Sequence, residues 1–265
     1  MARVISIINI KGGVGKTTIA FNLAHAIARL ERRVLLCDLD MQSNLTDLAA
    51  KEPDKLIATI YDVFTDENRL CSQTIYDTNV KDVDIIPADL RLIAVEKQIN
   101  PAINPEALTI LKNKLDQGIH DKYDYVIIDC RPDIDLLTMN ALMASDYYII
   151  PVLPDRHSIK GIQITDQYMR NALKANKNLQ ELGILINRFD GRTKLSDLML
   201  DALQERFEER MMSTIIRVNA GIDNAAAKRQ TIFQFDLRQS GCESFRDLAD
   251  EVLAKVGDHG EQDAG

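Results

Sequence analysis

The chain has 265 residues, of which 46% are hydrophobic and 27% charged, as in an ordinary globular protein. Its four cysteines are scattered and form no C-x-x-C pair, which argues against a disulfide framework or a zinc site. The sequence has neither an apolar run long enough to span a membrane nor a signal peptide, so we expect a cytoplasmic protein without membrane contact. A net charge of −8 argues against nucleic-acid binding unless positive charge is concentrated in one place.

Short apolar segments alternate with helical patterns along the chain. Strand-like runs occupy residues 3–9, 33–38, 83–87, 123–129, 147–152 and 183–187, and helical patterns occupy 16–30, 105–117, 136–145, 160–176 and 195–210. The strand-like runs are almost continuously hydrophobic, as expected for strands buried on both faces of a parallel sheet. The sequence therefore predicts an α/β fold with a doubly wound, mostly parallel sheet and helices on both faces.

No internal repeat or interdomain linker interrupts this alternation, so we expect one domain over residues 1–256. Asn104 and Pro105 are expected to begin the helix at 105–117, as its N-cap and its first residue. Residues 257–265 are polar, acidic and glycine-containing, and we expect them to form a disordered tail.

Residues 8–18, INIKGGVGKTT, nearly match the phosphate-binding P-loop pattern G-x-x-x-x-G-K-[ST]. Gly15, Lys16 and Thr17 provide its second half. Ile10 stands where the first glycine belongs, and Lys11 adds a positive charge. The segment follows a predicted strand and opens a predicted helix, which is the context that the pattern requires.

Such a loop can hold the phosphates of a nucleotide in several ways. Backbone N–H groups can donate to phosphate oxygens at the positive end of the following helix. The Lys16 ammonium can reach the β- and γ-phosphates, and the Thr17 hydroxyl can bind Mg²⁺. We therefore expect a site for nucleotide phosphates and Mg²⁺, with backbone contacts from Gly12, Gly13, Gly15 and Lys16.

Acidic residues follow two of the predicted strands. Asp38 and Asp40 end the segment LLCDLD and share one side of an extended chain, so both can face the ligand crevice. One suitable role is to orient a water for attack on the γ-phosphate, although a pair of solvent-exposed turn residues is an equally good interpretation. Asp129 ends the apolar strand of YDYVIID, as in a Walker B motif whose acid holds Mg²⁺ or its water ligands.

These three segments, in this order, resemble the ParA/MinD family of P-loop ATPases, whose Walker A loop deviates from the usual pattern. The specific element is KGGVGKTT, because Lys11 matches the signature lysine of that family. The segments DLDMQSN, DCRPDIDLLTMNAL, IPVLPD and IFQFD resemble further blocks, so the resemblance extends from about Arg3 to Val256. Within the family, the chain is similar to the short ParA, Soj-like branch.

The resemblance implies roles for individual residues. Two ATP-bound subunits meet face to face, and Lys11 crosses to the phosphates of the other subunit's nucleotide, while Lys16 serves its own site. Asp40 positions the attacking water, and Asp38 supports the adjacent switch segment. Thr17 ligates Mg²⁺, and Asp129 holds a water of its coordination shell.

Two more residues are expected to contact the nucleotide. Thr18 directly follows the P-loop threonine. Asn187 ends the sixth predicted strand, where it is a candidate for the adenine base. A turn residue at the end of a strand is an equally good interpretation of Asn187.

Positive charge is concentrated in residues 156–194, which carry eight Lys or Arg against three Asp or Glu, a net charge of +5. By itself this stretch is best interpreted as a solvated helix face. The resemblance gives it another meaning, because ParA dimers bind double-stranded DNA without sequence preference through basic residues of the C-terminal half.

Arg192 occupies the position of a DNA-contacting arginine in the family. A second such position holds Gly221 in this chain. Nearby basic residues that can substitute for it, with ordinary surface charge as an equally good interpretation, are Arg217, Lys228 and Arg229.

The resemblance thus implies a partition ATPase that dimerises on ATP, associates with the nucleoid and hydrolyses ATP weakly until a ParB-like adaptor stimulates it. A ParA-like ATPase that positions a protein cargo, such as a chemoreceptor cluster or microcompartment, is the alternative, and a metabolic P-loop ligase is less consistent with Lys11. The acidic tail lacks the amphipathic helix by which MinD-like relatives bind membrane. Departures from the family pattern lie in the switch segments, at Met41, Arg131, Asp133 and Asp135.

Overall fold

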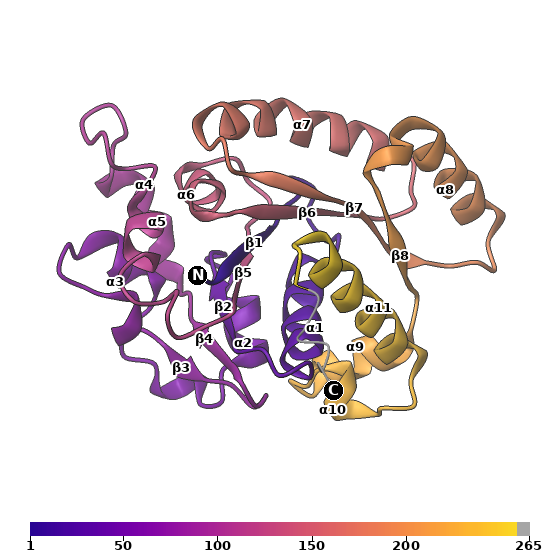
Figure 1. Ribbon diagram of the computed structural model, residues 1–265, viewed down its shortest axis with the longest axis horizontal. Helices are drawn as coiled ribbons and strands as arrows, with labels where there is room; N and C mark the ends of the chain where they lie inside the picture. The colour runs from indigo at the N-terminus through magenta and orange to yellow at the C-terminus, as the bar shows by residue number, and fades with distance from the viewer. Residues whose placement is uncertain (259–265) are drawn as a thin grey trace, which may run out of the picture.

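The computed structural model describes residues 1–258, whose eight strands form one sheet (Figure 1). The strand order is β3-β4-β2-β5-β1-β6-β7-β8, and every neighbouring pair is parallel except β3 and β4. The expected doubly wound, mostly parallel sheet is therefore confirmed. The strands are β1 (Arg3–Ile7), β2 (Val34–Asp38), β3 (Tyr76–Asp77), β4 (Val83–Ile86), β5 (Tyr125–Asp129), β6 (Tyr147–Val152), β7 (Gln180–Phe189) and β8 (Met211–Arg217).

Helices cover both faces of the sheet, because successive residues of a buried strand point to opposite sides. Tyr125 and Ile127 of β5 pack with α1, α10 and α11, whereas Val126 and Ile128 pack with α3, α5, α6, α7 and α8. The helices are α1 (Lys16–Ala28), α2 (Asn44–Ala49), α3 (Ile60–Thr65), α4 (Val95–Gln98), α5 (Ile110–Leu115), α6 (Leu136–Ala144), α7 (Ser158–Ala175), α8 (Lys194–Phe207), α9 (Ala220–Ala227), α10 (Ile232–Phe235) and α11 (Ser240–Lys255). Short 3-10 helices are η1 (Pro53–Lys55), η2 (Cys71–Gln73), η3 (Leu90–Ala94) and η4 (Glu208–Arg210). Within residues 1–258, no helix combines the length and the hydrophobicity that crossing a membrane requires.

Three central strands end together at one edge of the sheet. Ile7 at the end of β1 is in register with Asp129 at the end of β5, and Asp129 is in register with Asp38 at the end of β2. The P-loop follows β1 directly and leads into α1. The fold therefore brings the three predicted motifs to one place.

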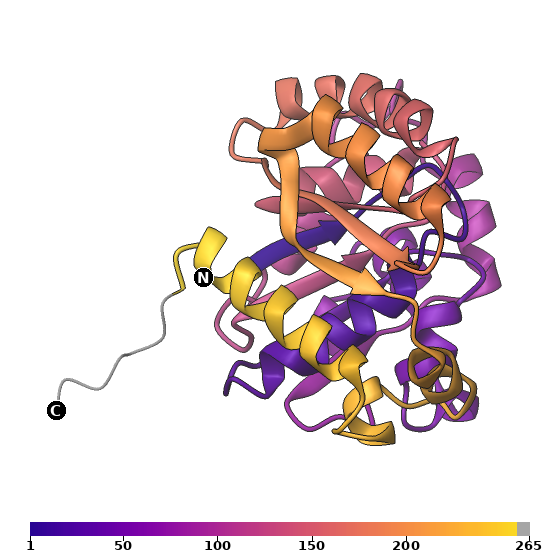
Figure 2. The same ribbon diagram turned by 90° about the vertical axis from the view of Figure 1, so that its right-hand side faces the viewer.

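The sheet contains two strands that the sequence analysis did not predict, β3 and β8. Figure 2 looks at the β8 edge of the sheet and shows α8 and α11 on either side of that strand. The run MMSTIIR of β8 contains β-branched residues typical of strands, but it adjoins the strong helical pattern of α8. β3 has two residues, too few to give a periodic signal.

The helix expected at 105–117 is shorter, and its expected N-cap is wrong. Helix α5 begins at Ile110 and ends at Leu115. Asn104 instead forms a local turn, in which its side-chain oxygen accepts a hydrogen bond from the backbone N–H of Glu106 at 2.9 Å. Asn favours such turns as strongly as helix caps, so the Asn-Pro signal does not distinguish the two.

The C-terminal part of the chain remains attached to the domain as far as Asp258. Its carboxylate accepts hydrogen bonds from the Arg32 guanidinium, at 2.9 and 3.1 Å, and from the Tyr125 hydroxyl at 2.7 Å. The rest of the predicted tail, residues 259–265, lies outside the described residues.

Candidate nucleotide-binding site

The P-loop follows a path that only glycine adopts easily. Gly13 and Gly15 have φ angles of 74° and 91°, in the left-handed region. A β-carbon on Gly15 would lie 2.3 Å from the Nδ2 atom of Asn187, so a larger residue there would displace the Asn187 side chain. Helix α1 begins at the next residue, and no side chain among the described residues caps its first N–H groups. These groups are open to an anion at the positive end of the helix.

Asn187 is hydrogen-bonded to the backbone of the P-loop. Its Nδ2 atom donates a hydrogen bond to the backbone oxygen of Val14 at 2.8 Å, and the side chain is buried. A hollow of about 30 Å³ beside it is also lined by Gly15, Thr18 and Arg217. The two predicted nucleotide contacts Thr18 and Asn187 therefore lie together, next to the phosphate loop. A contact of Asn187 with the base stays a prediction.

Lys16 is buried and has few hydrogen-bond partners among the described residues. Its side chain is 7% exposed, and its Nζ atom donates to the backbone oxygen of Asn9 at 3.1 Å. Burial lowers the pKa of Lys16, although the Asp129 carboxylate opposes that shift. An ammonium has three protons to donate, so Lys16 retains donors for phosphate oxygens.

Thr17 and Asp129 form the second polar pair of the site. The Thr17 hydroxyl donates to Oδ2 of Asp129 at 2.6 Å. Burial, followed by the neighbouring Asp38 charge, raises the pKa of Asp129 above its ordinary value. The other carboxylate oxygen, Oδ1, is buried and has no hydrogen-bond partner among the described residues. A buried, unpaired carboxylate oxygen beside a threonine hydroxyl fits a Mg²⁺ ion or a water of its coordination shell.

The protein would supply only part of such a coordination shell. Residues 1–258 contain no group of three or more His, Cys, Asp or Glu side chains that could hold a metal ion alone. Mg²⁺ commonly keeps several waters and binds through few protein groups plus substrate phosphates. The Thr17–Asp129 pair fits that mode of binding.

Asp38 and Asp40 have different surroundings. Asp38 is fully buried, and its oxygens accept bonds from the backbone N–H of Asp40 at 3.0 Å and from both N–H and hydroxyl of Thr46 at 2.9 and 2.8 Å. Burial raises the pKa of Asp38 despite these bonds. Asp40 is partly exposed, and one oxygen accepts from the backbone N–H of Gln42 at 2.9 Å. Asp38 thus fixes the turn after β2, whereas Asp40 remains accessible to water.

Lys11 reaches the loop between β6 and α7. Its ammonium pairs with the Asp155 carboxylate, and its backbone N–H donates to the side-chain oxygen of Asn9 at 2.8 Å. Burial raises the pKa of Asp155, but the Lys11 ammonium and the backbone N–H of His157 outweigh it, so the pKa is lower than usual. Sequence analysis did not identify Asp155 as a site residue, although it ends the segment IPVLPD.

The four basic residues expected to contact DNA do not share one environment. Arg192 is 82% exposed and pairs with Asp190 at 2.8 Å. The Arg217 guanidinium lies over the Phe189 ring, 5.3 Å from its centroid, and reaches the same turn at Gly191. Lys228 lies 5.0 Å from the ring centroid of Phe235.

Arg229 has a structural contact elsewhere. Its guanidinium donates to the backbone oxygens of Asp47 and Ala50, at the C-terminal end of α2. The fold therefore brings Arg192 and Arg217 together, while Arg229 caps a helix that follows β2.

Comparison with known proteins agrees with this geometry. A family model described as an AAA domain matches residues 2–181. Sporulation initiation inhibitor protein Soj of Bacillus subtilis (strain 168) is 35% identical over 255 residues, which cover 96% of this chain and 99% of Soj. Chromosome partitioning protein ParA of Myxococcus xanthus (strain DK1622) is 31% identical over 256 residues, which cover 96% of this chain and 89% of that protein.

A solved structure shares the fold over nearly its whole length. It is cobyrinic acid a,c-diamide synthase from Mycobacterium smegmatis with bound ADP and magnesium, with a TM-score of 0.83 and 27% identity. The match covers 97% of this chain and 96% of that chain. Together with the deviant P-loop and its lysine, these similarities assign the chain to the ParA/MinD family of P-loop ATPases.

Proposed function

We propose that the protein is a partition ATPase that binds ATP and Mg²⁺, dimerises in that state, binds DNA without sequence preference and is released by hydrolysis. The observation that carries the nucleotide part is the unpaired Oδ1 atom of Asp129 beside Thr17 and Lys16, at the start of α1. A Mg²⁺–triphosphate would supply partners for the Oδ1 atom of Asp129, the Lys16 ammonium and the first N–H groups of α1. Mg²⁺, when bound, would neutralise charge on the phosphates.

Each residue of the site has a separate role in hydrolysis. Lys16 and the N–H groups of the P-loop hold the phosphates, and the accessible carboxylate of Asp40 orients the attacking water. Asp38 keeps Asp40 in place through the backbone bond at 3.0 Å. Lys11 leaves Asp155 and reaches the nucleotide of a second copy, so hydrolysis depends on dimerisation.

The proposed DNA surface comprises Arg192 and Arg217. They come from the turn after β7 and the end of β8, and Arg192 is highly exposed. Two such surfaces in a dimer would contact phosphates of one duplex, and neutralising phosphates makes binding sensitive to salt. Arg229 is absent from this surface because its guanidinium is occupied at α2.

Two other functions use the same nucleotide site. A ParA-like ATPase that positions a protein cargo would retain every feature above, and a neighbouring gene for a ParB-like adaptor would separate it from a partition protein. A ligase is suggested by the similarity to cobyrinic acid a,c-diamide synthase. We prefer partition, because the curated relatives with 35% and 31% identity carry the names Soj and chromosome partitioning protein ParA.

The test is binding of random-sequence duplex DNA by the Asp40→Ala variant, which should hydrolyse ATP more slowly, at several salt concentrations. We expect salt-sensitive binding with ATP and Mg²⁺, none with ADP, and loss of binding in the additional Arg192→Glu variant. Arg238→Glu is a matched control, since Arg238 is 90% exposed and pairs with Asp236 two residues before it, as Arg192 does with Asp190. Equal binding with ATP and ADP, or none with either, would contradict the proposal.

A further inference from the structure

Arg229 adopts a backbone conformation that an arginine rarely takes. It lies in the turn that follows α9 and has a φ angle of 57°, in the left-handed region where a residue other than glycine is strained. The turn itself is fixed, because the backbone N–H of Ile232 donates to the side-chain oxygen of Asn22 in α1 at 2.8 Å. Strain of this kind persists where the surrounding structure imposes it, and it often marks a functional constraint.

The guanidinium of Arg229 caps a short helix. Its Nε atom donates to the backbone oxygen of Asp47, and its Nη2 atom donates to that of Ala50. Helix α2 has six residues, and a helix of that length is not stable by itself. Its N-cap residue, Ser43, has a left-handed φ angle of 55°, and its side chain caps no N–H group among the described residues. The C-terminal end of α2 is therefore completed by a side chain from a distant part of the sequence.

Backbone hydrogen bonds continue from this cap to Asp40. The N–H of Asp47, whose oxygen accepts from Arg229, donates to the oxygen of Ser43 at 2.8 Å. The N–H of Ser43 donates to the oxygen of Asp40 at 2.9 Å. The Asp40 carboxylate accepts from the N–H of Gln42 within the same turn. The path from Arg229 to the Asp40 carboxylate therefore passes through α2 and the turn that precedes it.

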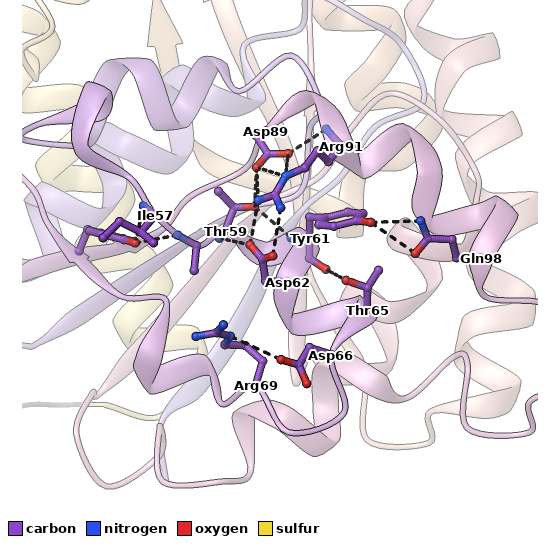
Figure 3. A network of polar contacts seen from close by, with 12 residues as sticks. Ile57, Thr59, Tyr61, Asp62, Thr65, Asp66, Arg69, Asp89, Arg91 and Gln98 are labelled. Atoms are coloured by element: carbon purple, nitrogen blue, oxygen red, sulfur yellow. Dashed lines mark hydrogen bonds and ion pairs between the residues drawn. The ribbon is translucent and has the colours of Figure 1, made fainter.

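Helix α2 has a second attachment, at Thr46. The Thr46 hydroxyl donates to the Asp38 carboxylate and accepts from the backbone N–H of Ala88, each at 2.8 Å. Ala88 directly precedes Asp89, which is held by the Arg91 guanidinium (Figure 3). This attachment is buried and belongs to the scaffold, whereas the attachment at the C-terminal end of α2 depends on one exposed arginine.

The hydrophobic core does not need the Arg229 contact. Leu45 and Ala49 of α2 are fully buried and pack in the same cluster as residues of α1. Removing the guanidinium should therefore leave α2 packed on the domain and change chiefly how firmly its ends are held.

We propose that Arg229 is a positioning residue for ATP hydrolysis, which caps α2 and thereby holds the Asp40 carboxylate where it orients the attacking water. This role rests on the proposed function, in which Asp40 orients that water. Placement matters in such a step, because a displacement of about 1 Å can cost about a hundredfold in rate. The left-handed backbone at Arg229 is retained because it directs the guanidinium toward α2.

Two substitutions separate the guanidinium from the backbone strain. Arg229→Gly and Arg229→Ala both remove the guanidinium, but glycine adopts a φ angle of 57° easily and alanine does not. The urea midpoint should therefore be higher for Arg229→Gly than for Arg229→Ala. The single-turnover rate of ATP hydrolysis should fall about three- to tenfold in both variants. The affinity for ATP and Mg²⁺ should stay within about twofold of wild type. A normal rate in Arg229→Gly would overturn the proposal.

The same substitution in the Asp40→Ala background tests whether Arg229 acts through Asp40. Arg229→Gly should leave the residual rate of Asp40→Ala unchanged, because no carboxylate remains to be positioned. An equal fold-loss in the two backgrounds would overturn the proposal.

Hydrogen exchange tests the structural link directly. The amide protons of Ser43 and Asp47 should exchange faster in Arg229→Gly than in wild type, because the cap that holds their segment is lost. Unchanged exchange at both amides would show that Arg229 does not hold this segment, and would overturn the proposal.

Two exposed residues provide matched controls. Glu31→Gly makes the same kind of backbone change, at a φ angle of 60° beyond the C-terminal end of α1. Arg238→Ala removes the same charge from a side chain that is 90% exposed. Neither should change the rate of hydrolysis. Turnover that does not depend on Asp40 would contradict the proposed function and this inference with it. Turnover that depends on Asp40 but not on Arg229 would overturn this inference alone.

Discussion

Two buried lysines, Lys16 in the P-loop and Lys114 in α5, are almost equally exposed, at 7% and 8%, yet they serve different purposes. Lys114 donates to three backbone oxygens, which use all of its protons. Lys16 has one acceptor among residues 1–258, at 3.1 Å, and burial lowers its pKa. A buried cation with complete pairing belongs to the scaffold, whereas one with incomplete pairing marks the place where a ligand must supply the remaining partners.

The same difference applies to the acids of the two regions. Asp62 in α3 and Asp89 at the start of η3 both bind Arg91. The Oδ1 atom of Asp129 in the nucleotide site has no partner among residues 1–258. The comparison therefore makes opposite predictions for substitutions in the two regions.

The largest effect is expected for Lys16→Met. Removing the ammonium deprives the phosphates of a preorganised cation, so ATP turnover should fall on the order of a hundredfold or more. The free energy of unfolding without nucleotide should not decrease, because an incompletely paired buried charge is removed. Turnover assays and urea unfolding test this, with Lys81→Met as a control at a side chain that is 93% exposed. A large loss of stability together with normal turnover would reverse the roles assigned here.

The opposite pattern is expected for Lys114→Met. Three backbone oxygens lose their shared donor, which should lower the free energy of unfolding by about 1–3 kcal/mol. The affinity for ATP and Mg²⁺ should stay within about twofold of wild type, because Lys114 contacts only the α3–α5 region. Urea unfolding and nucleotide titration on the same preparation give both quantities. An unchanged stability would show that the three bonds from Lys114 do not stabilise the packing of α5 against the segment after α3.

A pH effect is expected at Asp129 in the absence of Mg²⁺ and nucleotide. Because its pKa is raised, the native state keeps a proton that the unfolded chain releases above about pH 4, so the free energy of unfolding falls as the pH rises toward the raised pKa. Asp129→Asn should flatten this decline, and Mg²⁺ with ATP should flatten it in the wild type. Unfolding at about pH 5 and about pH 8 measures the difference between the two proteins, which includes the response of the neighbouring Asp38 carboxylate because its charge interacts with that of Asp129. Equal slopes would contradict the assignment of Asp129.

The smallest effect is expected at the pair of Lys11 and Asp155. Both side chains are partly exposed, and such pairs are worth about 0.2–1 kcal/mol. Asp155→Asn should release Lys11 and tighten ATP-dependent dimerisation by about two- to fivefold. Dimerisation weaker than wild type would mean that Asp155 acts within the dimer instead.

The sequence was sufficient to predict which functional residues lie at the strand ends. It was insufficient to predict contacts between residues that are distant in the chain. Asp38, Asp129 and the P-loop follow strands in short contiguous motifs, and parallel strands must bring those motifs to one edge. Arg229 was a DNA candidate because it is basic and lies near the family position that Gly221 occupies, but the acceptors of its guanidinium, in and beside α2, lie far away in sequence. No local pattern identifies such a contact.

Asp155 and Lys114 were missed for the same reason. Their roles depend on Lys11 and on the backbone oxygens after α3, which the tertiary fold places beside them. The wrong helix start at Asn104 has a local cause, because its side chain bonds the backbone two residues ahead instead of capping a helix.

The central claim is that Mg²⁺ and ATP complete the site and bring two copies together. The most direct test is sedimentation of the Asp40→Ala variant with Mg²⁺ and ATP, with Mg²⁺ and ADP, and with ATP and EDTA. The account predicts twice the mass of one chain in the first condition alone, and a monomer in all three after Lys11→Ala is added. A mass that does not depend on the nucleotide, or a dimer that persists without Lys11, would contradict it.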